Sequence, residues 1–269
     1  MQNFISYFVP FVFGLGIGSF LNCVIYRLEI KKSFLKGRSF CPNCKHQLSW
    51  QDLIPIFSFI ILRGKCRYCK KPISLQYPLV EIATGVLFIL IFQFLRFDFY
   101  LDFKFWIFSF VYYIFISCLL IIIFVSDLKH YIIPDEIVFP AILVSGIWNL
   151  VSGIFFHVYT KYEILNTIYS ALIAAGFFLL IVLVSKGNWM GVGDIKLVFF
   201  MGLFLGWPNT FVALFLAFFI GAIIGLGLVF FKNKALKSEI PFGPFLVFGT
   251  FVALFWVEKL INFYLGLFI

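Results

Sequence analysis

The sequence predicts an all-α polytopic membrane protein of about eight transmembrane helices, with a small cysteine-rich, zinc-binding cytoplasmic insert between the first two. Three observations support this fold class. Of the 269 residues, 63% are hydrophobic and only 12% are charged, whereas soluble domains carry about 25% charged residues. The apolar residues fall into long runs. The single long polar stretch, residues 27–79, contains four of the six cysteines.

Eight apolar runs are the expected spans. A helix needs about 20 apolar residues to cross a ~30 Å hydrocarbon core at 1.5 Å per residue. By this measure 80–95 is marginal, 195–205 is too short to cross, and Glu258 and Lys259 interrupt the last run. The runs are 4–25, 80–95, 105–125, 137–156, 164–184, 195–205, 210–231 and 242–269.

Positive charge is concentrated in the insert. Residues 27–79 carry eleven of the 21 Lys and Arg but only two acids, Glu29 and Asp52, so their net charge of +9 equals that of the whole chain. A basic excess beside membrane spans marks the cytoplasmic side. If the insert is cytoplasmic and eight spans alternate, 17 Lys and Arg face the cytoplasm and four face outside. We therefore expect an outside N-terminus and no nucleic-acid partner.

Two Cys-x-x-Cys pairs lie in the insert, Cys41 with Cys44 and Cys66 with Cys69. Four thiolates presented from two tight turns complete the tetrahedral shell of a structural zinc ion. A cytoplasmic location disfavours disulfides, and an insert this small needs a metal to supply much of its folding energy. A redox or unmetallated role stays open, and His46 is a substitute ligand that four thiolates make unnecessary.

Two aspartates beside the spans are the candidate catalytic pair. A carboxylate at the centre of a membrane helix costs about 2.5–3.5 kcal/mol, so each needs a reason. Asp127 ends the third run, and Asp194 follows a Gly-Val-Gly stretch before the sixth, at similar depth on the cytoplasmic side. Each alone is explained by helix capping or a headgroup contact. Two at matched depth can share a proton, one as base toward water and the other as acid.

The short sixth run adds a prediction about the backbone. Its eleven residues rise only about 17 Å as a helix. Either the turn at its outer end dips inward, or the helix begins below the cytoplasmic surface and the stretch from Gly191 to Gly193 enters the membrane as irregular backbone. Such backbone is tolerated where protein or a water-filled cavity covers it. Asp194 would then face a wet cleft.

The remaining acids have weaker signals. Asp135 and Glu136 follow Pro134 at the start of the fourth run, where carboxylates favour the helix dipole. Glu81 opens the second span from the cytoplasmic side, and a dipole role and a functional role are both consistent with that position.

A set of short stretches, in order along almost the whole chain, resembles a known family, the bacterial prepilin leader peptidases/N-methyltransferases, membrane aspartyl proteases of the GxGD type. One departure is Leu53, where the family often has an asparagine before Ile-Pro. The stretches are 18–22 with Tyr26 and Arg27, both cysteine pairs, 62–66, 77–81, Asp127 with 133–135, 191–196 and 241–245.

The resemblance implies a bacterial inner-membrane enzyme with two activities. Such enzymes cut type IV prepilins and pseudopilins, which enter from the bilayer, on the cytoplasmic side after a glycine; the aspartates that match Asp127 and Asp194 are catalytic. Many then methylate the new N-terminal residue with S-adenosylmethionine. The four-cysteine insert accompanies methylating members, and Glu81 matches a glutamate associated with methylation.

The expected organisation has three parts. Residues 1–26 form the first transmembrane helix, 27–79 form the zinc-binding insert, and 80–269 form the transmembrane aspartyl peptidase core. The insert together with 80–95 is the candidate methyltransferase region. Alternatives are a peptidase without methyl transfer, a proton-coupled transporter whose acids relay protons, and a zinc-bearing scaffold.

Overall fold

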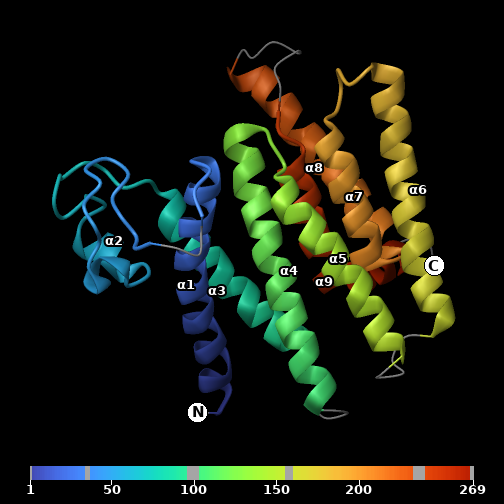
Figure 1. Cartoon of the computed structure of the whole chain (residues 1–269). Helices are drawn as coiled ribbons and strands as arrows, with labels where there is room; N and C mark the ends of the chain where they lie inside the picture. The colour runs from blue at the N-terminus through green and yellow to red at the C-terminus, as the bar shows by residue number, and fades with distance from the viewer. Residues whose placement is uncertain (1, 34–36, 96–102, 155–159, 233–239, 267–269) are drawn as a thin grey trace. The chain divides into compact units, whose positions relative to one another are not determined.

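The structure, a computed structural model, describes residues 2–33, 37–95, 103–154, 160–232 and 240–266. Over these residues the chain is helical apart from turns and two isolated bridges in the insert (Figure 1). The 3-10 helix η1 (Trp50–Leu53) and the short helix α2 (Phe57–Ile61) belong to the insert. The longer helices are α1 (Gln2–Glu29), α3 (Gln76–Phe94), α4 (Phe103–His130), α5 (Asp135–Ile154), α6 (Lys161–Ser185), α7 (Val192–Leu205), α8 (Asn209–Lys232) and α9 (Gly243–Gly266).

Seven of the described helices are long and apolar enough to cross a membrane, and this confirms the predicted all-α polytopic fold. The exception among the longer helices is α7, whose 14 residues rise only about 21 Å. The prediction that 195–205 is too short to cross is therefore confirmed. The predicted ends of two runs, at 155–156 and 267–269, lie outside the described residues.

Helix α3 begins earlier than its apolar run predicts. It starts at Gln76, and Pro78 lies in its first turn, where no intrahelical partner for an N–H is lost. Glu81 consequently lies in the second turn of α3. The prediction that Glu81 opens this span is therefore wrong. Because the dipole effect falls off within the first turn, a dipole role for Glu81 is disfavoured.

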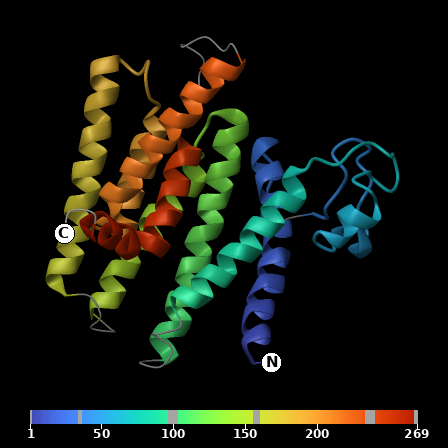
Figure 2. The same ribbon diagram turned by 180° about the vertical axis from the view of Figure 1, so that it is seen from behind.

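The chain divides into two compact units, Met1–Ile122 and Ile123–Ile269, and the boundary falls inside α4. In the first unit α1 packs directly on α3 (Figure 2). The contact is so close that a Cβ on Gly14 would lie 2.7 Å from the Cα of Gly85, and a Cβ on Gly18 would lie 2.7 Å from the Cα of Glu81. Small residues let the two backbones approach in this way.

In the second unit α7 lies among α5, α6, α8 and α9. After Lys196 it is apolar all round, as expected of a buried helix, and Gly202 packs against the backbone of Ala171 in α6. Asn149 in α5 donates hydrogen bonds to the carbonyl of Leu203 at 3.0 Å and to the Thr167 hydroxyl at 3.2 Å. These contacts fix α7, which is too short to span the membrane, at a defined place among four helices that are long enough. Its fully buried side chains are Leu197, Val198, Phe200 and Met201.

Candidate functional site

Asp127 lies in the last turn of α4 and is only 5% exposed. Its Oδ2 accepts a hydrogen bond of 2.8 Å from the backbone N–H of Gly243, the first residue of α9. The approach requires a glycine, because a Cβ at this position would lie 2.6 Å from Oδ2 of Asp127. The N-terminus of α9 therefore holds the carboxyl at the end of α4, with the positive end of its dipole nearby.

Asp194 lies in the first turn of α7 and is 8% exposed. Its Oδ2 accepts a hydrogen bond of 3.3 Å from the backbone N–H of Gly191, and its own N–H donates to the Gly191 carbonyl at 3.2 Å. Asp194 thus caps its own helix, as one sequence interpretation allowed. The capping uses one oxygen and leaves the other for chemistry.

The Gly-Val-Gly stretch is more helical than predicted. Gly191 is extended, with φ −78° and ψ 155°, but Val192 and Gly193 are already part of α7. The prediction of irregular backbone from Gly191 to Gly193 is therefore wrong for the last two residues, because the capping carboxyl starts the helix early. Gly193 is needed for packing: a Cβ there would lie 3.1 Å from the Cβ of Ile133.

The structure brings the two aspartates together in the second unit. The charge of Asp127 acts on the carboxyl of Asp194, although 67 positions separate them. Within the described part of the chain, each carboxyl makes its hydrogen bond through Oδ2 to a glycine N–H. Their Oδ1 atoms accept no hydrogen bond from the residues that the structure describes. Two buried carboxyls of this kind can share a proton and hold a water molecule.

Lys196, two positions after Asp194, pairs with an acid of another helix. The Nζ of Lys196 lies 2.7 and 2.9 Å from the two carboxylate oxygens of Asp135, in the first turn of α5, and 5.2 Å from the centre of the Phe139 ring. Asp135 therefore does more than favour its own helix dipole. It joins α5 to α7 and keeps the Lys196 charge on itself.

Glu81 belongs to the first unit and is 6% exposed. Its Oε2 accepts a hydrogen bond of 2.8 Å from the backbone N–H of Ile56, just before α2 in the insert, and Ser19 of α1 also hydrogen-bonds its carboxyl. Ile56 has φ 60° and ψ −52°, a conformation that β-branched residues rarely adopt. Glu81 thus connects a strained turn of the insert to the packed helices α1 and α3.

The four predicted cysteine ligands form one cluster. The sulfur atoms of Cys41, Cys44, Cys66 and Cys69 all lie within 4.8 Å of one another, and the Sγ atoms of Cys41 and Cys69 are 3.9 Å apart. A tetrahedral ZnS4 centre with Zn–S bonds of ~2.3 Å separates its sulfur atoms by about 3.8 Å. The separation of 3.9 Å matches this value, and the four thiols together form a group that could hold a metal ion. His46 instead stacks on Tyr68, with ring centres 3.7 Å apart.

The two cysteine turns are built alike. In the first, the N–H of Cys41 donates to the His46 carbonyl at 2.9 Å, and the N–H of Lys45 donates to the Cys41 carbonyl. In the second, Cys66 and Lys70 make the equivalent bonds. Lys45 and Lys70 each have φ 59°. The insert thus contains a repeated turn, visible in the sequence as Cys-x-x-Cys-Lys, that aims two thiols at one point.

Without a bound metal, the thiols of the cluster differ in pKa. Burial raises the pKa of Cys41, but hydrogen bonds from the backbone of Cys44 and Asn43 and from neighbouring thiols lower it to about 7. A backbone hydrogen bond from His46 lowers the pKa of Cys44, but burial and the nearby Cys41 and Cys69 raise it to about 11. Four thiolates this close need a cation, because like charges repel.

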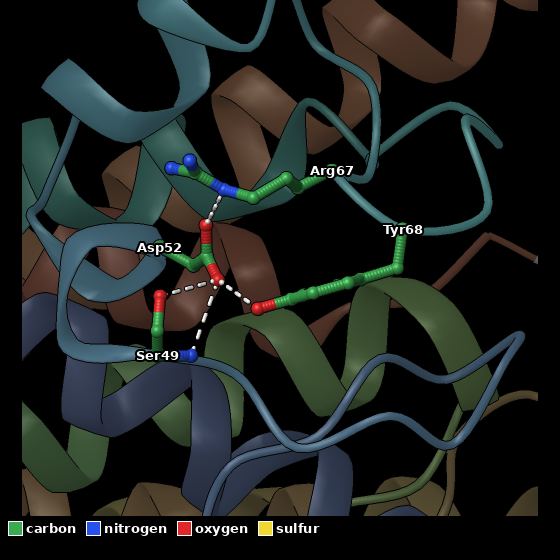
Figure 3. A network of polar contacts seen from close by, with 4 residues as sticks. All are labelled: Ser49, Asp52, Arg67 and Tyr68. Carbon is green, nitrogen blue, oxygen red and sulfur yellow. Dashed lines mark hydrogen bonds and ion pairs between the residues drawn. The ribbon is translucent and has the colours of Figure 1, made fainter.

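A polar network that sequence reasoning missed ties the insert together (Figure 3). The carboxylate of Asp52 accepts the backbone N–H and hydroxyl of Ser49 at 3.1 and 2.8 Å. It also accepts Nε of Arg67 at 2.7 Å and the hydroxyl of Tyr68 at 3.3 Å. Burial raises the pKa of Asp52, but the bonds from Ser49 and Arg67 together hold it below its usual range. The capping-box spacing Ser-x-x-Asp was the available signal.

Comparison with known proteins gives concordant results over the length of the chain. Residues 12–95 match the model of the bacterial peptidase A24 N-terminal domain, and residues 114–226 match that of the type IV leader peptidase family. No solved structure gives a significant match.

Three relatives illustrate the similarity, and each is named prepilin leader peptidase/N-methyltransferase. The protein of Bacillus subtilis (strain 168) is 33% identical, over 96% of this chain and 97% of its own length. That of Legionella pneumophila is 32% identical, over 97% and 94%. That of Aeromonas hydrophila is 29% identical, over 95% and 92%.

Proposed function

The chain belongs to the prepilin leader peptidase/N-methyltransferase family of aspartic peptidases, and we propose that it removes the leader from type IV prepilins and pseudopilins by a reaction at Asp127 and Asp194. One observation carries the proposal. Two carboxyls from distant parts of the chain are both buried, and each is held through one oxygen by a glycine N–H. The charge of Asp127 also acts on the carboxyl of Asp194. Family membership favours this peptidase over a proton-relaying transporter or a scaffold.

The proposed reaction uses one water molecule and one proton shared by the pair. The ionised carboxylate takes a proton from the water, whose oxygen attacks the scissile carbonyl carbon. The protonated partner first donates to the carbonyl oxygen, and a carboxyl then protonates the leaving amine as the C–N bond breaks. The N–H groups of Gly243 and Gly191 keep each Oδ2 in place, so the Oδ1 atoms are the oxygens that meet water and substrate.

The proposed substrate geometry follows from charge and burial. The net charge of +9 on residues 27–79 supports a cytoplasmic insert and an outside N-terminus. Asp127 and Asp194 then lie toward the cytoplasmic ends of α4 and α7. A precursor helix that enters from the bilayer would keep its basic leader in the cytoplasm and unwind at this pair. We propose cleavage after a glycine, between leader and hydrophobic segment.

We propose structural zinc as the ion held by the cysteine cluster, Cys41, Cys44, Cys66 and Cys69. The sulfur spacing supports it, and two of the four thiols are buried, as in a closed site with no open coordination position. In this role the metal fixes the insert between α1 and α3 and takes no part in peptide hydrolysis.

We further propose N-methylation of the new N-terminal residue. The names of the relatives support it, and so does the insert, which Glu81 anchors to α3. S-adenosylmethionine would supply the methyl group. The alternative is a peptidase without methyl transfer, in which the insert is structural only.

The test uses purified full-length protein in lipid vesicles with a pilin precursor, with and without S-adenosylmethionine. Mass spectrometry of the product should find a new N-terminus directly after a glycine in both samples, and a methylated one only with the methyl donor. A free amine in both samples would leave the peptidase alone. An uncut precursor in both samples would contradict the proposal.

A further inference from the structure

The segment from Trp50 to Ile61 presents apolar side chains on the outside of the insert. Within α2, the residues Phe57, Ile60 and Ile61 are 62%, 63% and 73% exposed. Their spacing of three and four positions places them on one face of the helix. The ring of Phe59 points the other way, since a Cβ on Gly64 would lie 3.2 Å from it. Three further exposed residues lead into this face, namely Trp50, Leu53 and Ile54.

The depth of this face is set by contacts with the first pair of spans. Ile56, immediately before α2, is bonded to Glu81 of α3, which in turn meets Gly18 and Ser19 of α1. Ser19 lies ten positions before Glu29, the last residue of α1, or about 15 Å along the helix. In both views α2 lies level with α1 and not beyond its end (Figures 1 and 2).

This depth falls inside the hydrocarbon core. The span Ile5–Glu29 has 25 residues, about 37 Å, and so exceeds a ~30 Å core by about 7 Å. Even if all of that excess lies at the Glu29 end, Ser19 remains below the boundary. The neighbours Phe20 and Ile82 are themselves exposed apolar residues of the spans, as lipid-facing residues are.

The rest of the insert is level with the membrane surface. Its first cysteine turn is next to the end of α1: the Phe40 ring packs edge-on against Tyr26, and Arg27 donates to the Gly37 carbonyl at 2.9 Å. Exposed basic residues, including Arg63 and Lys65 just after α2, match the negative charge of phospholipid headgroups. An apolar face below and a basic body above is the pattern of an interfacial membrane element.

We propose that residues 50–61 form a membrane anchor of the insert, in which the face of Phe57, Ile60 and Ile61 contacts lipid acyl chains of the leaflet where α1 ends. The insert is therefore not a freely solvated loop. It is fixed to the membrane at three places: through α1, through α3, and through α2 lying in the lipid. The hydrogen bond from Ile56 to Glu81 sets the angle at which α2 enters.

Photocrosslinking tests the anchor in the full-length protein. Benzoylphenylalanine would replace Phe57 or Ile60 in protein reconstituted into vesicles of phosphatidylethanolamine and phosphatidylglycerol. Two positions serve as controls: Phe59, which faces the insert, and Lys45, which is exposed at the level of the end of α1. Circular dichroism and size-exclusion chromatography establish that each variant is folded.

We expect phospholipid adducts at positions 57 and 60, at a yield about tenfold above that at positions 45 and 59. Adducts to a second copy of the chain, adducts to a co-reconstituted precursor, or equal yields at all four positions would overturn the proposal. A parallel measurement uses hydrogen exchange of the peptide covering α2. Its amides should exchange more slowly in vesicles than in a short-chain detergent, and equal rates would also count against an anchor.

Discussion

The backbone N–H of Gly243 donates a hydrogen bond of 2.8 Å to Oδ2 of Asp127, across 116 positions of sequence. The bond fixes one carboxyl of the proposed pair from outside its own helix. It explains why the stretch 241–245 belongs to the motifs of the chain although it contains no acid, base or nucleophile. The stretch contributes a backbone N–H donor, and only a glycine can bring this donor so close to Asp127.

Gly243→Ala is expected to lower the rate of leader cleavage about 100-fold, because the added Cβ displaces Oδ2 of Asp127 by a fraction of an ångström or more. The measurement is the rate of precursor cleavage in vesicles. Gly146→Ala is the matched control, since a Cβ on Gly146 meets nothing within 4 Å. Full activity of Gly243→Ala would show that the glycine does not position the carboxyl.

Removal of a cluster cysteine is expected to separate the two proposed activities. Cys41→Ser should lose the bound metal and most methylation, because the insert loses the folding energy of the site, and should lower the cleavage rate less. Elemental analysis and the methylated fraction of the product provide the readouts. Cys118→Ser, at a cysteine inside α4 away from the cluster, should keep both. Retention of metal by Cys41→Ser would contradict the assigned ligands.

The Asp52 network is expected to stabilise the insert by about 1 kcal/mol through the charged bond from Arg67, after allowance for the partial exposure of that arginine. Arg67→Gln should therefore raise amide exchange rates across 49–72 about fivefold. Arg63→Gln, at an exposed arginine of the same insert, should not.

The pH dependence of this contribution has a definite sign. Because the pKa of Asp52 is held below its usual range, its stabilising effect is fully present above the ordinary aspartate value of about 3.9. The effect is lost as the pH falls through the lowered value. A difference between wild type and Asp52→Asn that grew on acidification would contradict this account.

Glu81 is expected to act by positioning the insert. Glu81→Ala should raise exchange of the Ile56 amide tenfold or more, since a hydrogen bond to a charged group contributes about 1.5–3 kcal/mol. Glu81→Gln can still accept this bond through its side-chain carbonyl, and it should preserve most of the protection and part of the methylation. If Glu81→Gln keeps the protection of Ile56 but loses all methylation, Glu81 has a chemical role instead.

Much of the architecture could be predicted from local patterns. Hydropathy runs were sufficient to predict the spans, because in lipid an apolar run must satisfy its backbone hydrogen bonds internally and therefore forms a helix. The length of 195–205 was sufficient to identify the short helix. The meeting of Asp127 and Asp194 was predictable from topology, since the C-terminal end of α4 and the N-terminal end of α7 were both expected on the cytoplasmic side.

What could not be predicted depends on contacts between distant segments. The role of Gly243 requires α9 to begin against α4, and the role of Gly193 requires Ile133 beneath it. The burial of Glu81 depends on the close packing of α3 against Gly18. None of these contacts leaves a periodic trace, because each involves a single residue and the backbone of a remote one.

Leader cleavage by three single-charge variants tests the central claim most directly. Asp127→Asn, Asp194→Asn and Asp135→Asn each replace one carboxylate by an amide in the second unit, and only the first two alter the proposed pair. Each variant is co-expressed with a pilin precursor, and the processed fraction is measured in membranes that contain equal amounts of enzyme. The account predicts no cleavage by Asp127→Asn or Asp194→Asn and near-normal cleavage by Asp135→Asn. Cleavage at the normal rate by either of the first two would contradict it.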